Sequence, residues 1–308
     1  MSINIFKNKI TVAVHSGDFH ADDVFACATL SFWAGKEGKK LKIIRTRDPE
    51  IIDKADIAVD VGNVYDADKN RFDHHQKGGA GKRENGIPLA SFGAIWKKYG
   101  GEICENQEIA DRVEKNLVMP IDAIDNGINI SSRVSEFNVS EHRTSNVIRN
   151  FNLTWQENNK LVFKQFEKAI NLAKEILLRE IVWAKALVQG KKEIEKIIKE
   201  QNEPEVLILD NKIDWHEAVS ENRKIKLVVY PKIDKDWGIQ VARDDLEDYN
   251  SNRVTFPKDW CGLRDEVLIE VSGVKEAVFC ADKGWFAVAK TKEGAIEMAN
   301  KALQINQN

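Results

Sequence analysis

Hydrophobic and polar positions in the first third of the chain follow two alternating patterns. Residues 9–16, 40–47 and 55–62 are short runs rich in β-branched residues, which is typical of strands. Between the first two runs, residues 21–35 form an apolar segment of helical length that ends at a glycine. This strand-helix-strand order predicts a mostly parallel sheet with helices on its faces.

Helical periodicity dominates the middle of the chain. Residues 89–101 and 106–127 predict two helices, and the glycine pair at the end of the first is expected to stop it. A long amphipathic pattern then runs from residue 161 to about residue 199. Residues 77–88 are rich in glycine and basic side chains and predict a mobile loop or lid.

The last third predicts a second region that mixes strands and helices. Its strand-like runs are residues 205–210, 224–231, 237–245, 276–282 and 285–291. A helical pattern follows at residues 292–304. We therefore expect an α/β fold with a mostly parallel sheet flanked by helices, followed by a smaller α+β domain. The expected boundaries are an α/β domain over residues 1–160, a connector helix over 161–203 and the α+β domain over 204–308.

Composition restricts the function classes. The chain has 308 residues and a formal net charge of -3, which excludes a strongly basic protein held to nucleic acid by bulk attraction but leaves room for a local basic groove. No apolar run has the length of a membrane span, and no secretory signal is predicted. The cysteines are scattered at Cys27, Cys104, Cys261 and Cys280, a pattern that favours a reducing compartment such as the cytoplasm.

Histidines and aspartates gather where the predicted strands end. They form four short segments: His15, His20, Asp22 and Asp23; Asp60; Asp73, His74 and His75; and Asp122 and Asp125. Because ligands bind outside the carboxyl ends of strands in an open parallel sheet, these segments are expected to converge. Taken singly, each residue has an ordinary explanation as a solvated side chain, a helix cap or a turn residue. Four of the six histidines lying in two short stretches, each beside a carboxylate, favour a site.

Several carboxylates beside imidazoles would repel one another and raise their own pKa values unless cations neutralised them. A pair of divalent metal ions is the economical solution. Mixed nitrogen and oxygen ligands favour manganese, with zinc and magnesium as alternatives. Two such ions can activate a water and bind both the attacking and the leaving oxygen at a phosphoryl centre, so the pattern indicates phosphate-ester hydrolysis.

The segments "HSGDFHADDVFACATL", "DVGNVYDADKNRFDHHQKG" and "IDAIDNGI" resemble the successive motifs of the DHH phosphoesterase superfamily, and within it the melanocyte-proliferating-gene family of metal-dependent hydrolases. The resemblance extends to "FPKDWCGLRDE" and "KTKEGAIEMANKAL" and so covers most of the chain. It implies a two-domain enzyme in which the smaller domain closes over the substrate.

The resemblance also implies roles for the residues. The metal ligands would be His15, His20, Asp22, Asp60, His74 and Asp125, with Asp22 and Asp60 as bridging carboxylates. The catalytic set would be Asp60, His75, which would face the phosphate, and Asp73, which could instead orient its neighbour through a hydrogen bond. The presence of His20, where related phosphatases carry an aspartate, shifts the metal preference toward zinc or manganese.

Some members of the melanocyte-proliferating-gene family are described as 3′-to-5′ RNA exonucleases, so the resemblance implies RNA or a short oligonucleotide as the substrate. The candidate substrate-binding residues are Lys77, Arg133, Arg264 and Lys290. The glycine pair that often grips substrate in the second domain is missing from "DKGWFAVAKTKEG". Trp285 and three other tryptophans could stack on bases, although packing explains each of them as well. A homodimer remains open.

The sequence is also compatible with two other functions. "HADD" also resembles a motif of zinc-dependent N-deacetylases, in which a metal and a carboxylate base hydrolyse an amide; that function leaves Asp60 and the "DHH" run unexplained. A non-catalytic module, in which metal only stabilises a surface that binds RNA or protein, would retain the same ligands.

Overall fold

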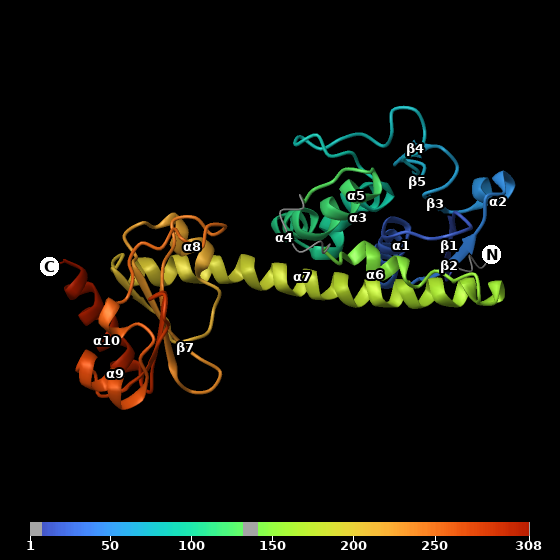
Figure 1. The fold of residues 1–308 in the computed structure, drawn as a ribbon. Helices are drawn as coiled ribbons and strands as arrows, with labels where there is room; N and C mark the ends of the chain where they lie inside the picture. The colour runs from blue at the N-terminus through green and yellow to red at the C-terminus, as the bar shows by residue number, and fades with distance from the viewer. Residues whose placement is uncertain (1–7, 132–140, 308) are drawn as a thin grey trace. The chain divides into compact units, whose positions relative to one another are not determined.

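The computed structural model describes residues 8–131 and 141–307, so the predicted substrate contact Arg133 lies outside the described residues. Internal contacts divide the chain into two units, Met1–Lys185 and Ala186–Asn308. Each unit has its own five-stranded sheet with helices (Figure 1), which confirms the predicted mixed α/β architecture. In the described part of the chain, no helix combines the length and apolar character needed to cross a bilayer.

The first sheet has the strand order β2-β1-β3-β5-β4. Its strands are β1 (Lys9–Val14), β2 (Lys40–Arg45), β3 (Ile57–Val59), β4 (Tyr65–Asp66) and β5 (Arg71–Phe72). The pairs β2–β1, β1–β3 and β3–β5 are parallel, and the edge strand β4 pairs with β5 in the antiparallel direction. The chain crosses over through helices between β1, β2 and β3, as parallel pairing requires.

The helices of the first unit cover this sheet. They are α1 (Ala21–Lys36), α2 (Pro49–Lys54), α3 (Ser91–Cys104), α4 (Gln107–Val113), α5 (Met119–Asp125) and α6 (Thr144–Arg149), with a π-helical turn at Glu114–Val118 between α4 and α5. Helices α1 and α3 pack against each other; α1 also contacts β2 and β3, and α3 contacts β5. Ile52 of α2 packs with Ala13 and Ala58. Side chains alternate between the faces of a strand, so Ala13 lies on the opposite face from the buried Val12 and Val14.

The expectation that the glycine pair ends the helix predicted over residues 89–101 is wrong, because α3 continues through it to Cys104. A Cβ atom on Gly100 would lie 2.7 Å from the ring of Trp96, so glycine is required there for close packing. Helix α1 likewise continues past Gly35 by one residue. The single helix expected over residues 106–127 is interrupted by the π-helical turn.

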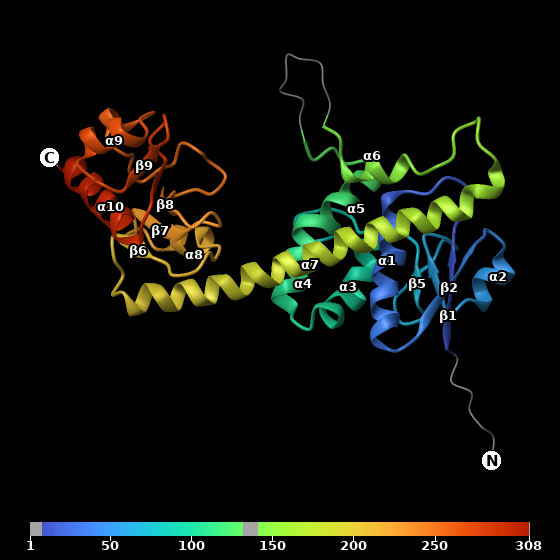
Figure 2. The ribbon, with the colours of Figure 1, turned by 90° about the horizontal axis from the view of Figure 1, so that it is seen from below.

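Helix α7 (Val162–Glu200) spans the boundary between the units. Its first half crosses α1 (Figures 1 and 2), and the Phe166 ring centroid lies 5.2 Å from that of Phe19, which precedes α1. Its last turns belong to the second unit, where Ile194 and Ile198 join a buried cluster with Val228. A short 3-10 turn, Asn159–Leu161, precedes the helix.

The second sheet has the order β6-β7-β8-β10-β9. Its elements are β6 (Val206–Ile208), α8 (His216–Glu221), β7 (Leu227–Pro231), β8 (Trp237–Val241), the 3-10 turn Lys258–Trp260, α9 (Asp265–Ser272), β9 (Ala277–Cys280), β10 (Phe286–Ala289) and α10 (Lys292–Gln307). Only β6 and β7 are parallel among these pairs. Val229 packs with α10 through Met298, whereas its neighbour Val228 packs with α7, so both faces of the sheet are covered.

Candidate metal centre

Three parallel strands deliver side chains to the same edge of the first sheet. His15 follows β1, Asp60 follows β3 and Asp73 follows β5, and these strands are neighbours in the sheet. Their carboxyl ends therefore meet, as the sequence led us to expect. Asp60 has φ of 54°, in the left-handed region, which turns the chain sharply after the strand.

The start of α1 adds a second group of side chains. His20 is the N-cap residue, and its backbone N–H donates to Asp23 Oδ1 over 2.9 Å. Asp22 is fully buried and accepts hydrogen bonds from the backbone N–H groups of Ser91 and Phe92, at 3.2 and 2.6 Å. The same carboxylate therefore binds the first turn of α3 and fixes that helix against α1.

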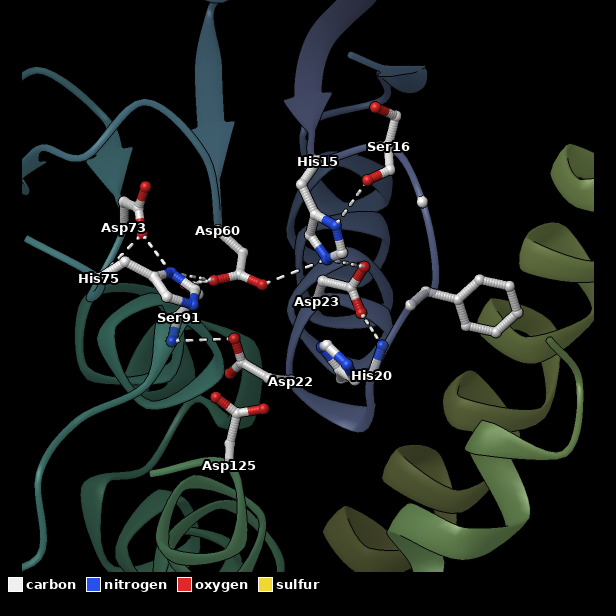
Figure 3. Close-up of polar contacts among 12 residues, drawn as sticks. His15, Ser16, His20, Asp22, Asp23, Asp60, Asp73, His75, Ser91 and Asp125 are labelled. Carbon is white, nitrogen blue, oxygen red and sulfur yellow. Dashed lines mark hydrogen bonds and ion pairs between the residues drawn. The ribbon is translucent and has the colours of Figure 1, made fainter. Parts of the chain in front are cut away.

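Asp60 lies at the centre of the arrangement (Figure 3). One carboxylate oxygen is 3.4 Å from His15 Nε2, and the other is 3.3 Å from both His74 Nε2 and His75 Nδ1. The hydroxyl of Ser91 donates to that second oxygen at 3.3 Å. On the far side, Asp125 Oδ2 lies 3.2 Å from His74 Nε2.

Among the residues that the structure describes, three groups of side chains have ligand atoms close enough together to hold a cation. They are His15, His20 and Asp60; Asp60, His74 and His75; and Asp22, His74 and Asp125. The first two groups share Asp60, and the last two share His74. Every residue that the sequence analysis named as a metal ligand occurs in at least one group, so the chain brings the whole predicted set together. Which of them bind metal remains a prediction.

The donor atoms fit a bound metal. His15 Nε2 and His74 Nε2 are buried without a hydrogen-bond partner among the described residues, although each points at carboxylate oxygens. Burial, with the nearby carboxylates of Asp125 and Asp60, raises the pKa of Asp22 well above its usual value. Unpartnered imidazole nitrogens beside crowded carboxylates are what a divalent cation satisfies.

The same carboxylates raise the pKa values of His74 and His75. Burial alone would lower the pKa of His74, but Asp125 and Asp60 outweigh it and raise the value to about 11. Asp60 raises the pKa of His75 to about 9, against the effect of burial and with further help from Asp73. These shifts show a strongly negative pocket that stabilises positive charge.

Asp73 contacts its neighbours rather than the centre of the site. Its Oδ1 lies 2.9 Å from His75 Nδ1, and its Oδ2 accepts the backbone N–H of Asn63 at 2.6 Å. Because a carboxylate only accepts, Nδ1 of His75 carries the proton and Nε2 is left to face outward. This geometry agrees with the orienting role that the sequence left open for Asp73.

Within the described part of the chain, two cavities adjoin the centre, and each is lined by an arginine. One, of about 400 Å³, is lined by His15, Asp60 and Arg47. The other, of about 350 Å³, is lined by Asp60, Asp125 and Arg149. No motif marked either arginine, and only the fold brings them to the site.

Asp23, whose role was open, lies with Oδ2 at 3.1 Å from His15 Nε2.

The predicted substrate contacts lie in both units. Lys77 is exposed and lines neither cavity. Arg264 and Lys290 lie in the second unit, where the guanidinium of Arg264 lies 5.0 Å from the centroid of the Phe279 ring. Their contact with a substrate stays a prediction.

A buried ion-pair network connects the glycine-rich loop to α5 and to the π-helical turn that precedes it. Arg83, in the glycine-rich loop, pairs with Asp122 at 2.6 Å and with Glu114 at 2.5 Å. Asp122 is fully buried and also accepts the backbone N–H of Gly93 at 3.0 Å. The loop predicted to be mobile is thus anchored at Arg83.

We expect Arg83→Met to destabilise the first unit by about 3 kcal/mol, since removing one partner of a buried pair leaves the other charge uncompensated. Urea unfolding followed by circular dichroism would measure this change. Lys82→Met, at the exposed neighbouring position, is the matched control and should unfold like the parent protein. Equal stability of the two variants would show that the network carries no stabilising role.

A model of the family described as "Uncharacterised protein family (UPF0160)", and named for the MYG1 exonuclease, matches residues 11–303. The MYG1 protein of Dictyostelium discoideum is 32% identical over 320 residues, which cover 96% of this chain and 96% of the relative. The chain belongs to this family. The MYG1 exonuclease of Homo sapiens is 28% identical over 323 residues, which cover 95% of this chain and 85% of that relative.

Among solved structures, the MYG1-family chain is similar to RecJ from Thermus thermophilus, a structure in complex with Mn²⁺. The identity is 12% and the TM-score is 0.30. The match covers 96% of this chain and 52% of the RecJ chain, so the chain spans about half the length of that protein.

Proposed function

We propose that the protein is a metal-dependent phosphodiesterase of the DHH type that shortens single-stranded nucleic acid or short oligonucleotides from an end. RNA, degraded in the 3′-to-5′ direction, is the proposed substrate. The observation that carries the proposal is the position of Asp60, whose two oxygens face His15 on one side and His74 and His75 on the other. The exonuclease names of the bovine and human relatives support the same class of reaction.

The residues divide into two ligand sets around Asp60. His15 and His20 would hold one ion with Asp60, and Asp22, His74 and Asp125 would hold the second. Manganese is the proposed metal, because the donors are mixed imidazole nitrogens and carboxylate oxygens. When bound, the ions would lower the pKa of a water and neutralise charge on the phosphoryl oxygens.

We infer that His75 acts on the substrate. Its side chain is 60% exposed and lines both cavities beside the centre. With Nδ1 held by Asp73, Nε2 is free to donate a hydrogen bond to a phosphoryl oxygen or a proton to the leaving oxygen. Arg47 and Arg149, which line these cavities, would bind the phosphate at the cleaved bond and the phosphate next to it in the strand.

The site's composition favours this reaction over amide hydrolysis. An N-deacetylase would need one metal, held by the residues of "HADD" and a further ligand. Asp60 and His74 would then have no role, yet they lie at the middle of the cluster and connect its ligand sets.

Asp73→Asn is expected to lower kcat/KM by about 10- to 100-fold, the usual loss when a group that orients a functional histidine is replaced. Asparagine has one acceptor oxygen, so it cannot bind both His75 Nδ1 and the Asn63 N–H, as the two carboxylate oxygens do. Steady-state kinetics with a labelled oligonucleotide would measure the loss. The matched control is Asp68→Asn, at an exposed position in the β4–β5 turn. Equal kcat/KM values for the two variants would show that Asp73 does not contribute to the reaction.

The function itself is tested with a short single-stranded RNA and its DNA counterpart, each labelled in turn at the 5′ and the 3′ end. Metal-stripped protein is supplied with Mn²⁺, Mg²⁺ or Zn²⁺. Stepwise shortening of the 5′-labelled RNA supports a 3′-to-5′ exonuclease. Absence of cleavage of either strand with every ion, in protein that binds metal, would contradict the proposal and favour a non-catalytic module.

A further inference from the structure

The second unit contains a cavity of about 560 Å³ that the proposed catalytic centre does not use. It lies where β8 ends and β10 begins, with Val241 and Trp285 among its lining residues. Lys290, the predicted substrate contact of this unit, follows the other end of β10. The cavity is therefore separate from the stretch that the sequence suggested for gripping substrate.

Two aromatic side chains line the cavity and are open to solvent. Trp285 is 44% exposed and Tyr249 is 81% exposed. Trp96 and Trp260, by contrast, are buried in the cores of their units. The Trp285 ring is stacked against that of Phe286, with the centroids 5.4 Å apart, and its exposed part offers an aromatic surface to a planar ligand.

Two cationic side chains line the cavity without forming an ion pair within the described residues. The Cζ atom of Arg243 lies 4.7 Å from the centroid of the Tyr249 ring, and its Nη1 is buried with no hydrogen-bond partner among the described residues. Lys283, also in the lining, forms no ion pair within the described part of the chain. Nearby Arg253 differs, because its guanidinium donates to Asp244 and to backbone carbonyl groups. Arg253 is thus structural, whereas Arg243 is available to a ligand.

Uncharged polar groups complete the lining. Gln240, Asn250 and Asn252 are among the lining residues. Within the described chain, no lining residue carries a carboxylate. Gln240 is held in place by the hydroxyl of Tyr230, which donates to its Oε1 at 3.0 Å. Aromatic faces, cations and amides are the groups that bind a nucleobase and its phosphate.

Acidic residues outside the lining limit long-range attraction. Asp245, Glu247 and Asp248 lie in the loop that carries Tyr249. Binding must therefore depend on stacking and on short contacts with Arg243 and Lys283, and its dependence on salt should be shallow.

We propose that this cavity binds one nucleotide of a single-stranded nucleic acid, with the base against Trp285 and Tyr249 and the phosphate on Arg243 and Lys283. The inference rests on the proposed function for the identity of the strand, and it adds a binding site remote in sequence from the metal ligands. A strand held there would remain attached between successive cleavages.

The test measures binding without turnover. A fluorescein-labelled oligo(U) of about 12 nucleotides, long enough to cover a single-strand site of ordinary size, and oligo(dT) beside it, would be titrated with metal-stripped full-length protein in EDTA while fluorescence anisotropy is recorded. Trp285→Ala and Arg243→Gln are each expected to weaken binding about 10-fold, the effect of losing one base-stacking or phosphate-binding group. Arg243→Gln should also reduce the slope of log affinity against log salt by about 0.7.

Two variants separate recognition from folding. Trp285→Phe keeps an aromatic face and should bind within about threefold of the parent, and Trp155→Ala, 91% exposed in the first unit, should bind like the parent. Unchanged binding by Trp285→Ala and Arg243→Gln, or no binding by the parent protein, would overturn the inference. Because no hydrolysis is measured, an inactive catalytic centre would leave this result intact.

Discussion

Asp60→Asn is expected to lower kcat/KM for oligonucleotide hydrolysis by at least about 10²-fold, the cost of removing one preorganised charged group from an active site. The substitution removes the negative charge that lies between His15 and His74 and replaces one oxygen with an amide nitrogen, which does not bind a cation. Steady-state rates at saturating Mn²⁺ would measure the loss.

Asparagine is the right replacement because the backbone of Asp60 is in the left-handed region, with φ of 54°. Asparagine tolerates that region better than alanine does, so folding should be retained. Melting curves of the parent and variant would verify this, and Asp68→Asn again serves as the control. An Asp60→Asn protein that folds and hydrolyses oligonucleotides at the rate of the parent protein would rule out the dinuclear mechanism.

Chelation of the bound metal is expected to abolish hydrolysis and to lower the melting temperature. At a free metal concentration about a hundredfold above Kd, one occupied site contributes about 2.7 kcal/mol. For a unit of this size that corresponds to a shift of about 5–10 °C. Differential scanning calorimetry of the protein with Mn²⁺ and with EDTA would measure the shift.

The Asp60→Asn protein provides the comparison for this experiment. It lacks a ligand common to two of the three candidate groups, so EDTA should shift its melting temperature by less than that of the parent. Equal shifts in the two proteins would place the stabilising metal away from Asp60. No shift in the parent would show that metal does not stabilise this fold.

The sequence predicts the centre because its residues follow short strands. Parallel pairing of β1, β3 and β5 places whatever follows each strand at the same edge. His15 and Asp60 could be grouped because they end predicted strands, whereas Asp73 follows β5, a two-residue strand that the pattern did not predict. The proposed metal ligands His20 and Asp22, at the start of α1, follow the same logic, because that helix starts soon after the first of these strands.

The pattern of residues along the sequence could not predict contacts that depend on tertiary packing. Gly100 resembles a helix stop, and only the position of the Trp96 ring shows why glycine is needed within the helix. Arg47 and Arg149 reach the centre through the path of the chain around it, and no local spacing marks them. The short helices α6, α8 and α9 have six to eight residues each, too few for a clear periodic signal.

The central claim is that two metal ions act together around Asp60. Adding Mn²⁺ stepwise to metal-stripped protein, while following the release of nucleotides from a labelled RNA, tests it most directly. The rate should rise until two equivalents per chain are bound and then stay constant. Full activity without added metal, or a plateau at one equivalent, would contradict the account.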